Sequence, residues 1–537
     1  MEIFIAKTHS SEYLMHKYWA RKPHNIVAEF VKKYALPQQW VLDPFCGSGV
    51  TNIEAAKLGI NSIGIDINPL AVLIGKVAVT KVSIGKLGDY YDTFKKNVFK
   101  NIETHYCIPE GMIRYCVHRA IIKCPKCSNI LKTSEASMSG KTYICSRCNS
   151  RVPSNLSTVS SSEIISVTLL GSREPIMNSV ILKKQTSISN NSLDNILKTD
   201  SHKYNIRFLE NKRILSYENT MLSKFYTPRS FSILSYIADK IHNIDDKKIK
   251  NIFLLCLTST STQSSRLIPF RNDLSTGGPA WSVPGFWIPD IHLETNPILY
   301  FDVRFKKILK GLFTLNVAID KHANSIFLDT GINKSARILK TKKIGYIFAD
   351  PPYGDSIPYL EFSAIWNAWL KKKPNYEEEI VVSDSTVRNK KWDRYKFEMT
   401  NAVAKLSSCL SPRGHITFTF NQLSLEAGHT LLLATEKACL DFEDISMALP
   451  AVIPSKARFS VKGSYIGDFY VTFRKVLKIS RNKISDNDFI NNLDSIFMEL
   501  SSCRKGYFYF PHIIRVIIGL ILKNRYSASM IKIAEDY

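Results

Sequence analysis

The feature that most constrains the fold is an acidic, glycine-containing turn between a buried strand and a helix. The strand WVL runs into Asp43-Pro-Phe-Cys-Gly47-Ser-Gly49, the segment TNIEAAKLG has helical spacing, and NSIGID is a second strand that ends at Asp66. A strand, a glycine turn, a helix and another strand make half of a doubly wound nucleotide-binding sheet. The sequence therefore predicts an α/β fold with this turn at the carboxyl ends of the strands.

The same turn indicates the kind of ligand. Its glycines let the backbone approach a ligand closely, and N–H groups are left free at the start of the following helix. Asp66 lies 23 residues beyond Asp43, a separation typical of a carboxylate that binds ribose hydroxyls. The turn lacks the Gly-Lys-Ser/Thr of a triphosphate site. An acidic turn favours a cationic or zwitterionic ligand, and S-adenosylmethionine has this chemistry; a purely structural turn is the alternative.

A long insertion interrupts the predicted sheet. The α/β pattern stops near residue 84 and resumes at NSIFLDT and KIGYIFADPPYG, and a Ser/Asn-rich stretch at 187–195 is predicted to be a loop. The fold class is therefore a doubly wound, Rossmann-like sheet with an insertion that selects the substrate. We assign 1–84 and 321–475 to the two parts of the sheet domain, 85–320 to the insertion and 476–537 to a helical C-terminal tail.

A second acidic motif, Asp350-Pro-Pro-Tyr353, follows the strand YIFA. Ligands of open α/β sheets bind at the carboxyl ends of the strands, so this motif and the glycine turn are expected to face one crevice. Together, DPFCGSG, GIDINP and DPPY resemble motifs I, II and IV of the amino-group DNA methyltransferases, in an order similar to their alpha-type arrangement. HKYWARKPHN at 16–25 resembles their motif X. The resemblance covers about 1–80 and 260–475, and its DPPYGDSIPYLEFSAIWNAWL and AWSVPGFWIPDIHLETNP stretches are similar to a subgroup with a zinc-containing insertion.

The resemblance implies which residues bind the cofactor. Arg21 or Lys22 of motif X would meet the methionine carboxylate, and Asp329, at the end of the strand NSIFLD, matches motif III at the adenine amine. An ordinary basic surface patch and a turn cap are the respective alternatives. The predicted cofactor-binding residues are Arg21, Lys22, Asp43, Pro44, Phe45, Gly47, Gly49, Asp66 and Asp329.

The Asp-Pro-Pro-Tyr motif suits chemistry on an exocyclic amine, whose lone pair is delocalised into the base. Hydrogen bonds from the amine to the Asp350 carboxylate and the Pro351 carbonyl would favour a pyramidal nitrogen, which can attack the sulfonium methyl. Pro351 and Pro352 restrict the backbone, and Tyr353 offers a face for a base extruded from the duplex. Methylation at cytosine C5 would need a Cys nucleophile, normally in a Pro-Cys pair, and the chain has no such pair.

We therefore expect an S-adenosylmethionine-dependent DNA methyltransferase that acts on adenine N6. The first Asp of the motif resembles the adenine enzymes, because Ser usually replaces it in the cytosine-N4 group, yet cytosine N4 stays open. An RNA guanine-N2 methyltransferase is a second alternative, although few residues precede the glycine turn to form an RNA-capture domain. A non-enzymatic DNA-binding subunit is a third, and the intact Asp43, Asp66 and Asp350 count against it.

Two Cys-x-x-Cys pairs predict a metal site in the insertion. Cys124 and Cys127 are separated by 17 residues from Cys145 and Cys148, which fits a four-thiolate zinc ribbon at 124–148. A thioredoxin-like redox site would instead have one such pair beside a βαβ unit. Four protein ligands leave no position for water, so the Zn²⁺ is expected to be structural.

The charge of the chain indicates a polyanionic partner. It has 72 Lys plus Arg against 47 Asp plus Glu, a net charge of +25, which favours nucleic acid, here double-stranded DNA; an AT-rich genome is the alternative explanation. Arg266, Arg271, Trp281 and Trp287 are candidates for the base pocket or DNA groove, or for core packing. The absence of a long apolar run and of a signal peptide predicts a cytoplasmic protein with no membrane contact. A cognate restriction endonuclease is left open as a partner.

Overall fold

An eight-stranded sheet forms the centre of the computed structural model, which describes residues 2–140, 142–154, 158–217, 219–270, 285–355, 357–385, 387–420, 425–452, 467–503 and 518–536. The strand order is β1-β16-β17-β15-β14-β2-β3-β13. Strands β13, β3, β2, β14 and β15 are parallel, and β17 is antiparallel to both of its neighbours. The strands are β1 (Glu2–Ile5), β2 (Trp40–Asp43), β3 (Ser62–Asp66), β13 (Ser325–Asp329), β14 (Ile344–Ala349), β15 (Leu410–Phe420), β16 (Leu440–Leu449) and β17 (Asp468–Lys475).

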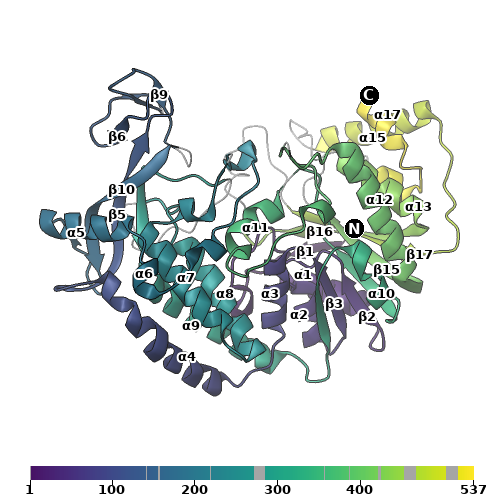
Figure 1. The fold of residues 1–537 in the computed structure, drawn as a ribbon. Helices are drawn as coiled ribbons and strands as arrows, with labels where there is room; N and C mark the ends of the chain where they lie inside the picture. The colour runs from purple at the N-terminus through teal and green to yellow at the C-terminus, as the bar shows by residue number, and fades with distance from the viewer. Residues whose placement is uncertain are drawn as a thin grey trace.

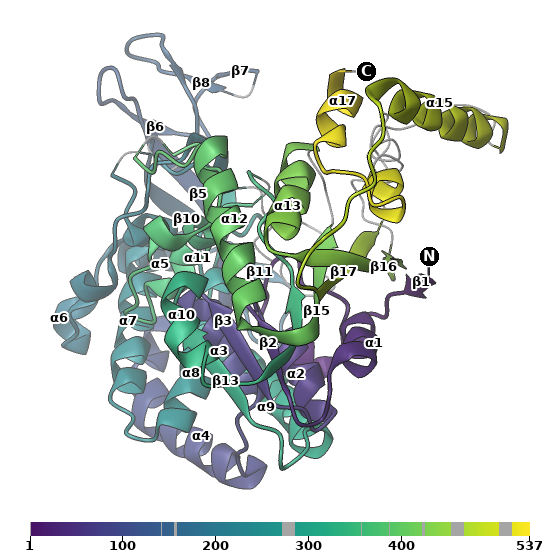
Figure 2. The same cartoon turned by 90° about the vertical axis from the view of Figure 1, so that its right-hand side faces the viewer.

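Helices cover both faces of this sheet (Figures 1 and 2). Val41 and Phe348 of the central strands belong to a core shared with one group of helices, while their neighbours Leu42 and Ile347 belong to a second core on the other face. All six residues of β14 are buried, as expected for a strand covered on both sides. The mixed α/β fold is thus confirmed. The first group is α1 (His24–Tyr34), α2 (Val50–Lys57), α3 (Pro69–Ala78) and α11 (Tyr359–Asn367); the second is α10 (Ile332–Leu339), α12 (Trp392–Cys409) and α13 (Leu425–Lys437).

Between α3 and β13 the chain leaves the large sheet and builds a second one, in the order β11-β10-β5-β12 with β4 and β6 also on β5. Figure 1 shows this part rising beside the large sheet, with β6 and β9 at its tip. The domain boundaries proposed from sequence stay predictions; α4 begins at Ile84, one residue before the predicted insertion. The elements are α4 (Ile84–Val98), β4 (Cys107–Ile108), β5 (Gly111–Lys123), β6 (Ile130–Lys132), β7 (Met138–Ser139), β8 (Thr142–Ile144), β9 (Arg151–Val152), β10 (Val159–Leu169), β11 (Pro175–Ile176), α5 (Ser179–Asn190), α6 (Asp194–Leu197), α7 (Pro228–His242), α8 (Lys247–Gln263), β12 (Ile291–Thr295) and α9 (Pro297–Ala318).

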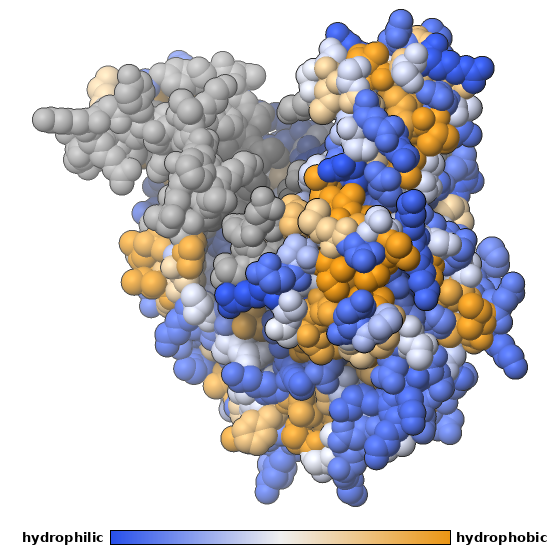
Figure 3. All heavy atoms as spheres, turned by 90° about the vertical axis from the view of Figure 1, so that its left-hand side faces the viewer, coloured by the Kyte–Doolittle hydropathy of each residue, from blue (hydrophilic) through white to orange (hydrophobic). Residues whose placement is uncertain are grey.

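The helices of this region pack directly against the sheet domain. One hydrophobic core runs from α1 and α3 into α7, α8 and α9, and His16 Nε2 lies 3.1 Å from Thr258 Oγ1 of α8. The surface on the side of α5 mixes polar and apolar residues (Figure 3), with Met177 and Val180 exposed. The insertion is therefore anchored to the sheet through its helices, while its second sheet projects away.

The Ser/Asn-rich stretch at 187–195 is not the loop that its composition predicts. Helix α5 continues to Asn190, and α6 begins at Asp194. Ser189 is fully buried and its hydroxyl donates to Glu294. A polar side chain with a buried partner can sit in a helix, so the prediction was wrong because tertiary hydrogen bonds outweigh local propensity here.

In the C-terminal tail, α15 (Asp486–Cys503) and α17 (Met530–Asp536) are described. Phe489 and Leu493 of α15 are buried in the core that contains α13, and Arg481 pairs with Glu436 and Asp441 of the sheet domain. Among the described helices, none has the length and apolar character that crossing a membrane requires.

Candidate active site and metal centre

Three acidic residues meet at the carboxyl ends of neighbouring parallel strands. Asp43 ends β2, Asp66 ends β3 and Asp350 follows β14, and all three line one pocket. Because β14, β2 and β3 are adjacent in the sheet, the chain brings together two motifs that lie about 300 residues apart. The glycine turn and the Asp-Pro-Pro-Tyr motif thus share a cavity.

The glycine turn is held in place by hydrogen bonds to Asp66. One carboxylate oxygen of Asp66 accepts from the N–H of Gly47 at 2.8 Å, and the other accepts from Asn68 N at 2.8 Å. Gly47 has φ +48, and a Cβ there would lie 3.1 Å from the ring of Tyr18. The turn therefore needs glycine at this position, both for its left-handed backbone and for the aromatic ring above it.

Burial makes two carboxyl groups in the pocket harder to ionise. It raises the pKa of Asp43 to about 7, helped by the nearby negative charge of Asp350, and it raises the pKa of Asp66 to about 6. Carboxyl groups that are costly to ionise in a dry cavity gain most from a cationic ligand. The carboxylates of the pocket fit the positively charged ammonium and sulfonium groups of S-adenosylmethionine. Pro44, Phe45 and Gly47 also line the pocket.

The Asp-Pro-Pro-Tyr motif is fixed by hydrogen bonds from two other elements. Asp350 Oδ1 accepts from the Tyr353 hydroxyl at 2.6 Å and from Thr419 of β15. Tyr395 of α12 donates to the carbonyl of Pro352 at 2.8 Å. No described residue donates to the carbonyl of Pro351, which lines the pocket with Pro352. Asp350 and Pro351 therefore line the same pocket.

Tyr353 does not line the pocket, although its hydroxyl fixes Asp350. Its role as a stacking face for a base stays a prediction. Gly354, which follows it, has φ +60, and a Cβ there would collide with the ring of Trp392. The chain can turn after Tyr353 only because position 354 has no side chain.

The two basic residues of the N-terminal motif have different surroundings. Arg21 donates to Ser48 Oγ at 2.8 Å and to the carbonyls of His16 and Tyr13, so it fastens the N-terminal segment to the glycine turn. Lys22 Nζ lies 3.3 Å from Asp350 Oδ1 and 3.2 Å from Asp468 Oδ2. Both residues line the pocket, but Lys22 is directed at the predicted catalytic carboxylate.

Two other predicted cofactor residues lie outside the pocket lining. Gly49 caps the start of α2 with φ +80. Asp329 is exposed and its carboxylate lies 3.4 Å from Lys372 Nζ, in an adjoining hollow, while the next residues, Thr330 and Gly331, line the main pocket. Contact of Asp329 with a cofactor stays a prediction.

Sequence reasoning missed part of the lining. Asn68 donates to Ser363 of α11 at 2.7 Å and thereby ties the end of β3 to that helix; its position just before Pro69 is a helix-cap signal that could have identified it. Tyr18, Tyr359 and Glu379 also line the pocket. Glu379 carries no local signal, because it reaches the site through an irregular segment.

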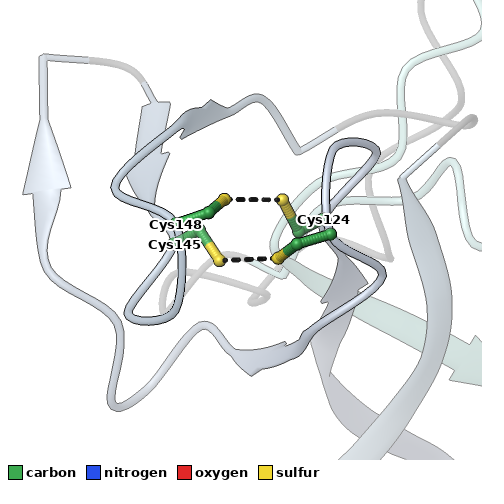
Figure 4. A group of neighbouring side chains, drawn as sticks. Cys124, Cys145 and Cys148 are labelled. Atoms are coloured by element: carbon green, nitrogen blue, oxygen red, sulfur yellow. Dashed lines mark hydrogen bonds between the residues drawn. The ribbon is translucent and has the colours of Figure 1, made fainter.

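The four predicted metal ligands form one cluster. The Sγ atoms of Cys124, Cys127, Cys145 and Cys148 all lie within 4.8 Å of one another. The Cys124–Cys148 and Cys127–Cys145 pairs are each 3.6 Å apart (Figure 4). Tetrahedral Zn²⁺ at about 2.3 Å from each sulfur would separate the sulfurs by about 3.8 Å. The cluster therefore fits a four-thiolate zinc site.

The other aromatic and basic candidates are not brought to the pocket where they are described. Arg266 is buried and donates to the carbonyl of Lys224 at 2.6 Å, and Trp287 is 51% exposed. Arg271 and Trp281 lie outside the described residues.

Comparisons with known proteins agree with these motifs. Residues 2–76 match a family model described as DNA methylase. The chain is 25% identical over 370 residues to the type II methyltransferase M.MjaII of Methanocaldococcus jannaschii, which covers 65% of this chain and 60% of that protein. It is also 47% identical over 47 residues to the type II methyltransferase M.BsoBI of Geobacillus stearothermophilus, 9% of each chain. The match to M.MjaII thus spans less than two thirds of that protein.

Proposed function

We propose that this chain, which is similar to a DNA methylase family model and to two type II methyltransferases, is a site-specific DNA methyltransferase. It transfers a methyl group from S-adenosylmethionine to an exocyclic amine of a base flipped out of duplex DNA. The observation that carries this proposal is the shared pocket of Asp350, Asp43 and Asp66. A cation-favouring turn and an amine acceptor lie in one cavity.

Bound S-adenosylmethionine supplies an electrophilic methyl group on its sulfonium. Asp43 and Asp66 would favour the cationic ligand, and the backbone around Gly47 would help to hold it. Asp350 and the Pro351 carbonyl accept the two N–H bonds of the target amine, so the nitrogen lone pair is freed to form the new N–C bond as the S–C bond breaks. The amine then loses one proton, which the Asp350 carboxylate can accept and pass to water.

Adenine N6 is the proposed target, and cytosine N4 is the alternative within the same chemistry. The support is the Asp at the first position of the motif, Asp350. Modification-aware sequencing of DNA from cells that express the chain reports the base, its position and the sequence context together. N4-methylcytosine in place of N6-methyladenine would overturn the choice of base but keep the reaction class.

The reaction is tested by transfer of labelled methyl groups to duplex DNA, tRNA and rRNA in parallel. We expect label in duplex DNA, and Asp350→Ala should abolish it while the cofactor dissociation constant stays within about threefold. Asp393→Ala, an exposed carboxylate on α12, is the matched control. Label in RNA alone would favour an RNA guanine-N2 methyltransferase, and a chain that binds no cofactor would favour a non-enzymatic DNA-binding subunit.

We also infer that the cysteine cluster holds one structural Zn²⁺, because four thiolates leave no position for water.

The type II names of the relatives support a place in a restriction-modification system, in the cytoplasm, beside a cognate restriction endonuclease. Genomic DNA from cells that express the chain would then resist cleavage by restriction endonucleases that recognise one particular sequence. DNA that every tested endonuclease cuts normally would argue for a solitary enzyme.

A further inference from the structure

Lys22 forms an ion pair that neither the motif resemblance nor the proposed chemistry requires. Its ammonium lies between Asp350 Oδ1, at 3.3 Å, and Asp468 Oδ2, at 3.2 Å, and its side chain is only 7% exposed. It also lies over the ring of Tyr353, at 5.9 Å from the ring centroid. The resemblance offered Lys22 as a ligand of the methionine carboxylate, whereas the structure directs it to the predicted catalytic carboxylate.

Asp468 reaches this position because of the one reversed strand of the sheet. It is the first residue of β17, which runs antiparallel to β15 with Thr419 opposite Tyr470. Its first residue therefore lies at the edge where the parallel strands end. Asp468 is 118 residues from Asp350 in sequence, and the side chain is 13% exposed.

The donors around Asp350 all converge on one oxygen. Oδ1 receives the hydroxyls of Tyr353 and Thr419 and faces the Lys22 ammonium. Oδ2 has no donor among the described residues. A carboxylate held by three groups on one oxygen is fixed in rotation, and its second oxygen is left for an incoming amine.

The two neighbouring carboxylates favour the charged form of Lys22. Burial alone would lower the pKa of Lys22, but the carboxylates of Asp350 and Asp468 reverse this and raise it. The ammonium therefore stays charged in a site that already contains Asp43 and Asp66. Without Lys22, no cation from the described part of the chain would lie between the carboxylates of Asp350 and Asp468.

We propose that Lys22 and Asp468 are a positioning pair for the methyl-transfer step: Lys22 holds the Asp350 carboxylate turned so that Oδ2 accepts the target amine, and Asp468 holds Lys22 there. Lys22 lines the pocket and is directed at Asp350, whereas Asp468 does not line the pocket. The inference rests on the proposed function, which it deepens by adding residues that control the methyl-transfer rate.

A double-mutant cycle tests the pair. We measure the single-turnover rate of methyl transfer to duplex DNA, and separately the dissociation constant of S-adenosylmethionine, for Lys22→Met, Asp468→Asn and the double variant. Loss of a hydrogen bond to a charged group predicts rates lower by roughly 10- to 150-fold for Lys22→Met and roughly tenfold for Asp468→Asn. The double variant should match Lys22→Met within about threefold if the effect of Asp468 on the rate is exerted through Lys22.

The matched control is the exposed pair of Lys33 and Asp444, joined at 2.8 Å between α1 and β16; Lys33→Met and Asp444→Asn should transfer methyl groups at the wild-type rate. Multiplicative losses in the double variant would overturn the proposal. So would a cofactor affinity that falls in Lys22→Met by the same factor as the rate, since Lys22 would then hold the cofactor. An unchanged rate in Asp468→Asn overturns it even where Lys22→Met does not fold. A wild-type chain that methylates no DNA instead refutes the proposed function, so the two failures are distinguishable.

Discussion

Asp66 shows how one residue can serve both the fold and the ligand. Its carboxylate holds the N–H groups of Gly47 and Asn68, yet burial raises its pKa to about 6. The folded chain therefore binds more protons than the unfolded chain between the normal carboxyl pKa of 3.8 and about 6. As pH rises through this window, the free energy of unfolding of the ligand-free protein should fall. The proposed cationic cofactor would offset this cost in stability, because an ionised Asp66 attracts a cation.

We expect binding of S-adenosylmethionine to depend on pH for the same reason. A cationic ligand favours the ionised carboxylate, so binding should release protons near pH 6, and the affinity should weaken by up to about tenfold per pH unit below it. The pKa of Asp43 is raised to about 7, so the pH dependence of the affinity should extend to higher pH. Titration calorimetry from pH 5 to 8, in buffers of different ionisation enthalpy, measures the protons released. Asp66→Asn should release fewer, and an affinity constant across this range would contradict the assignment.

Whether a site residue can be predicted from the sequence depends on how close it is to a local signal. Asp43 and Asp66 end strands and Asp350 directly follows one, so the sequence pattern alone places their side chains at one edge of the sheet. Thr419 lies near the end of β15 and Asp468 begins β17, but nothing in their own sequence says that β15 lies beside β14 and β17 beside β15. Only the strand order brings them to Asp350.

At the scale of elements, the predictions that succeeded relied on periodicity, and the one that failed relied on composition. The strands β2, β3, β13 and β14 and the helix α2 occur where their patterns predicted. The loop prediction for 187–195 failed because buried Ser189 donates to Glu294, which is itself paired with Arg229. The pairing of β5 with β10 and β12 also has no local signal.

The ribbon formed by β6 to β9 is the element whose stability should depend on metal. These strands are two or three residues long, too short to hold together without a further link. Cys127→Ser should lower bound zinc from about one per chain to near none. It should also increase amide exchange in the ribbon while cofactor affinity is unchanged.

The control for the ribbon is Cys107→Ser, an exposed cysteine of β4 outside the cluster, which should retain its zinc. Elemental analysis of the purified protein reports the metal, and hydrogen exchange reports the ribbon. A wild-type chain that contains no zinc would dispose of the assignment. Increased exchange spread over the large sheet would instead mean that the metal supports the whole fold.

At the scale of the molecule, the net charge of +25 is the property that no single site explains. The pocket is acidic, so the excess positive charge lies outside it and is available to phosphates. The ribbon, at the tip of the projecting sheet in Figure 1, contributes Lys126, Arg147 and Arg151. A duplex whose flipped base enters the pocket would then be held by charge on surrounding surfaces, while the pocket reads only the base.

Because the phosphates and the cofactor would bind to different parts of the molecule, we expect salt to weaken the binding of DNA but not the binding of the cofactor. If 6 to 10 phosphates are neutralised, the DNA association constant should fall by about 10³ to 10⁵ between 50 and 200 mM salt, measured by fluorescence anisotropy with a labelled duplex. Replacing Lys126, Arg147 and Arg151 by Gln should reduce the slope of log K against log salt by about 0.9 for each phosphate that is no longer neutralised. The affinity for the cofactor should change little over the same range of salt, because the carboxylates of the pocket are buried and are therefore screened less by salt. A slope unchanged in the triple variant would place the DNA away from the ribbon, and equal salt sensitivity of both ligands would mean that the acidic pocket is open to solvent.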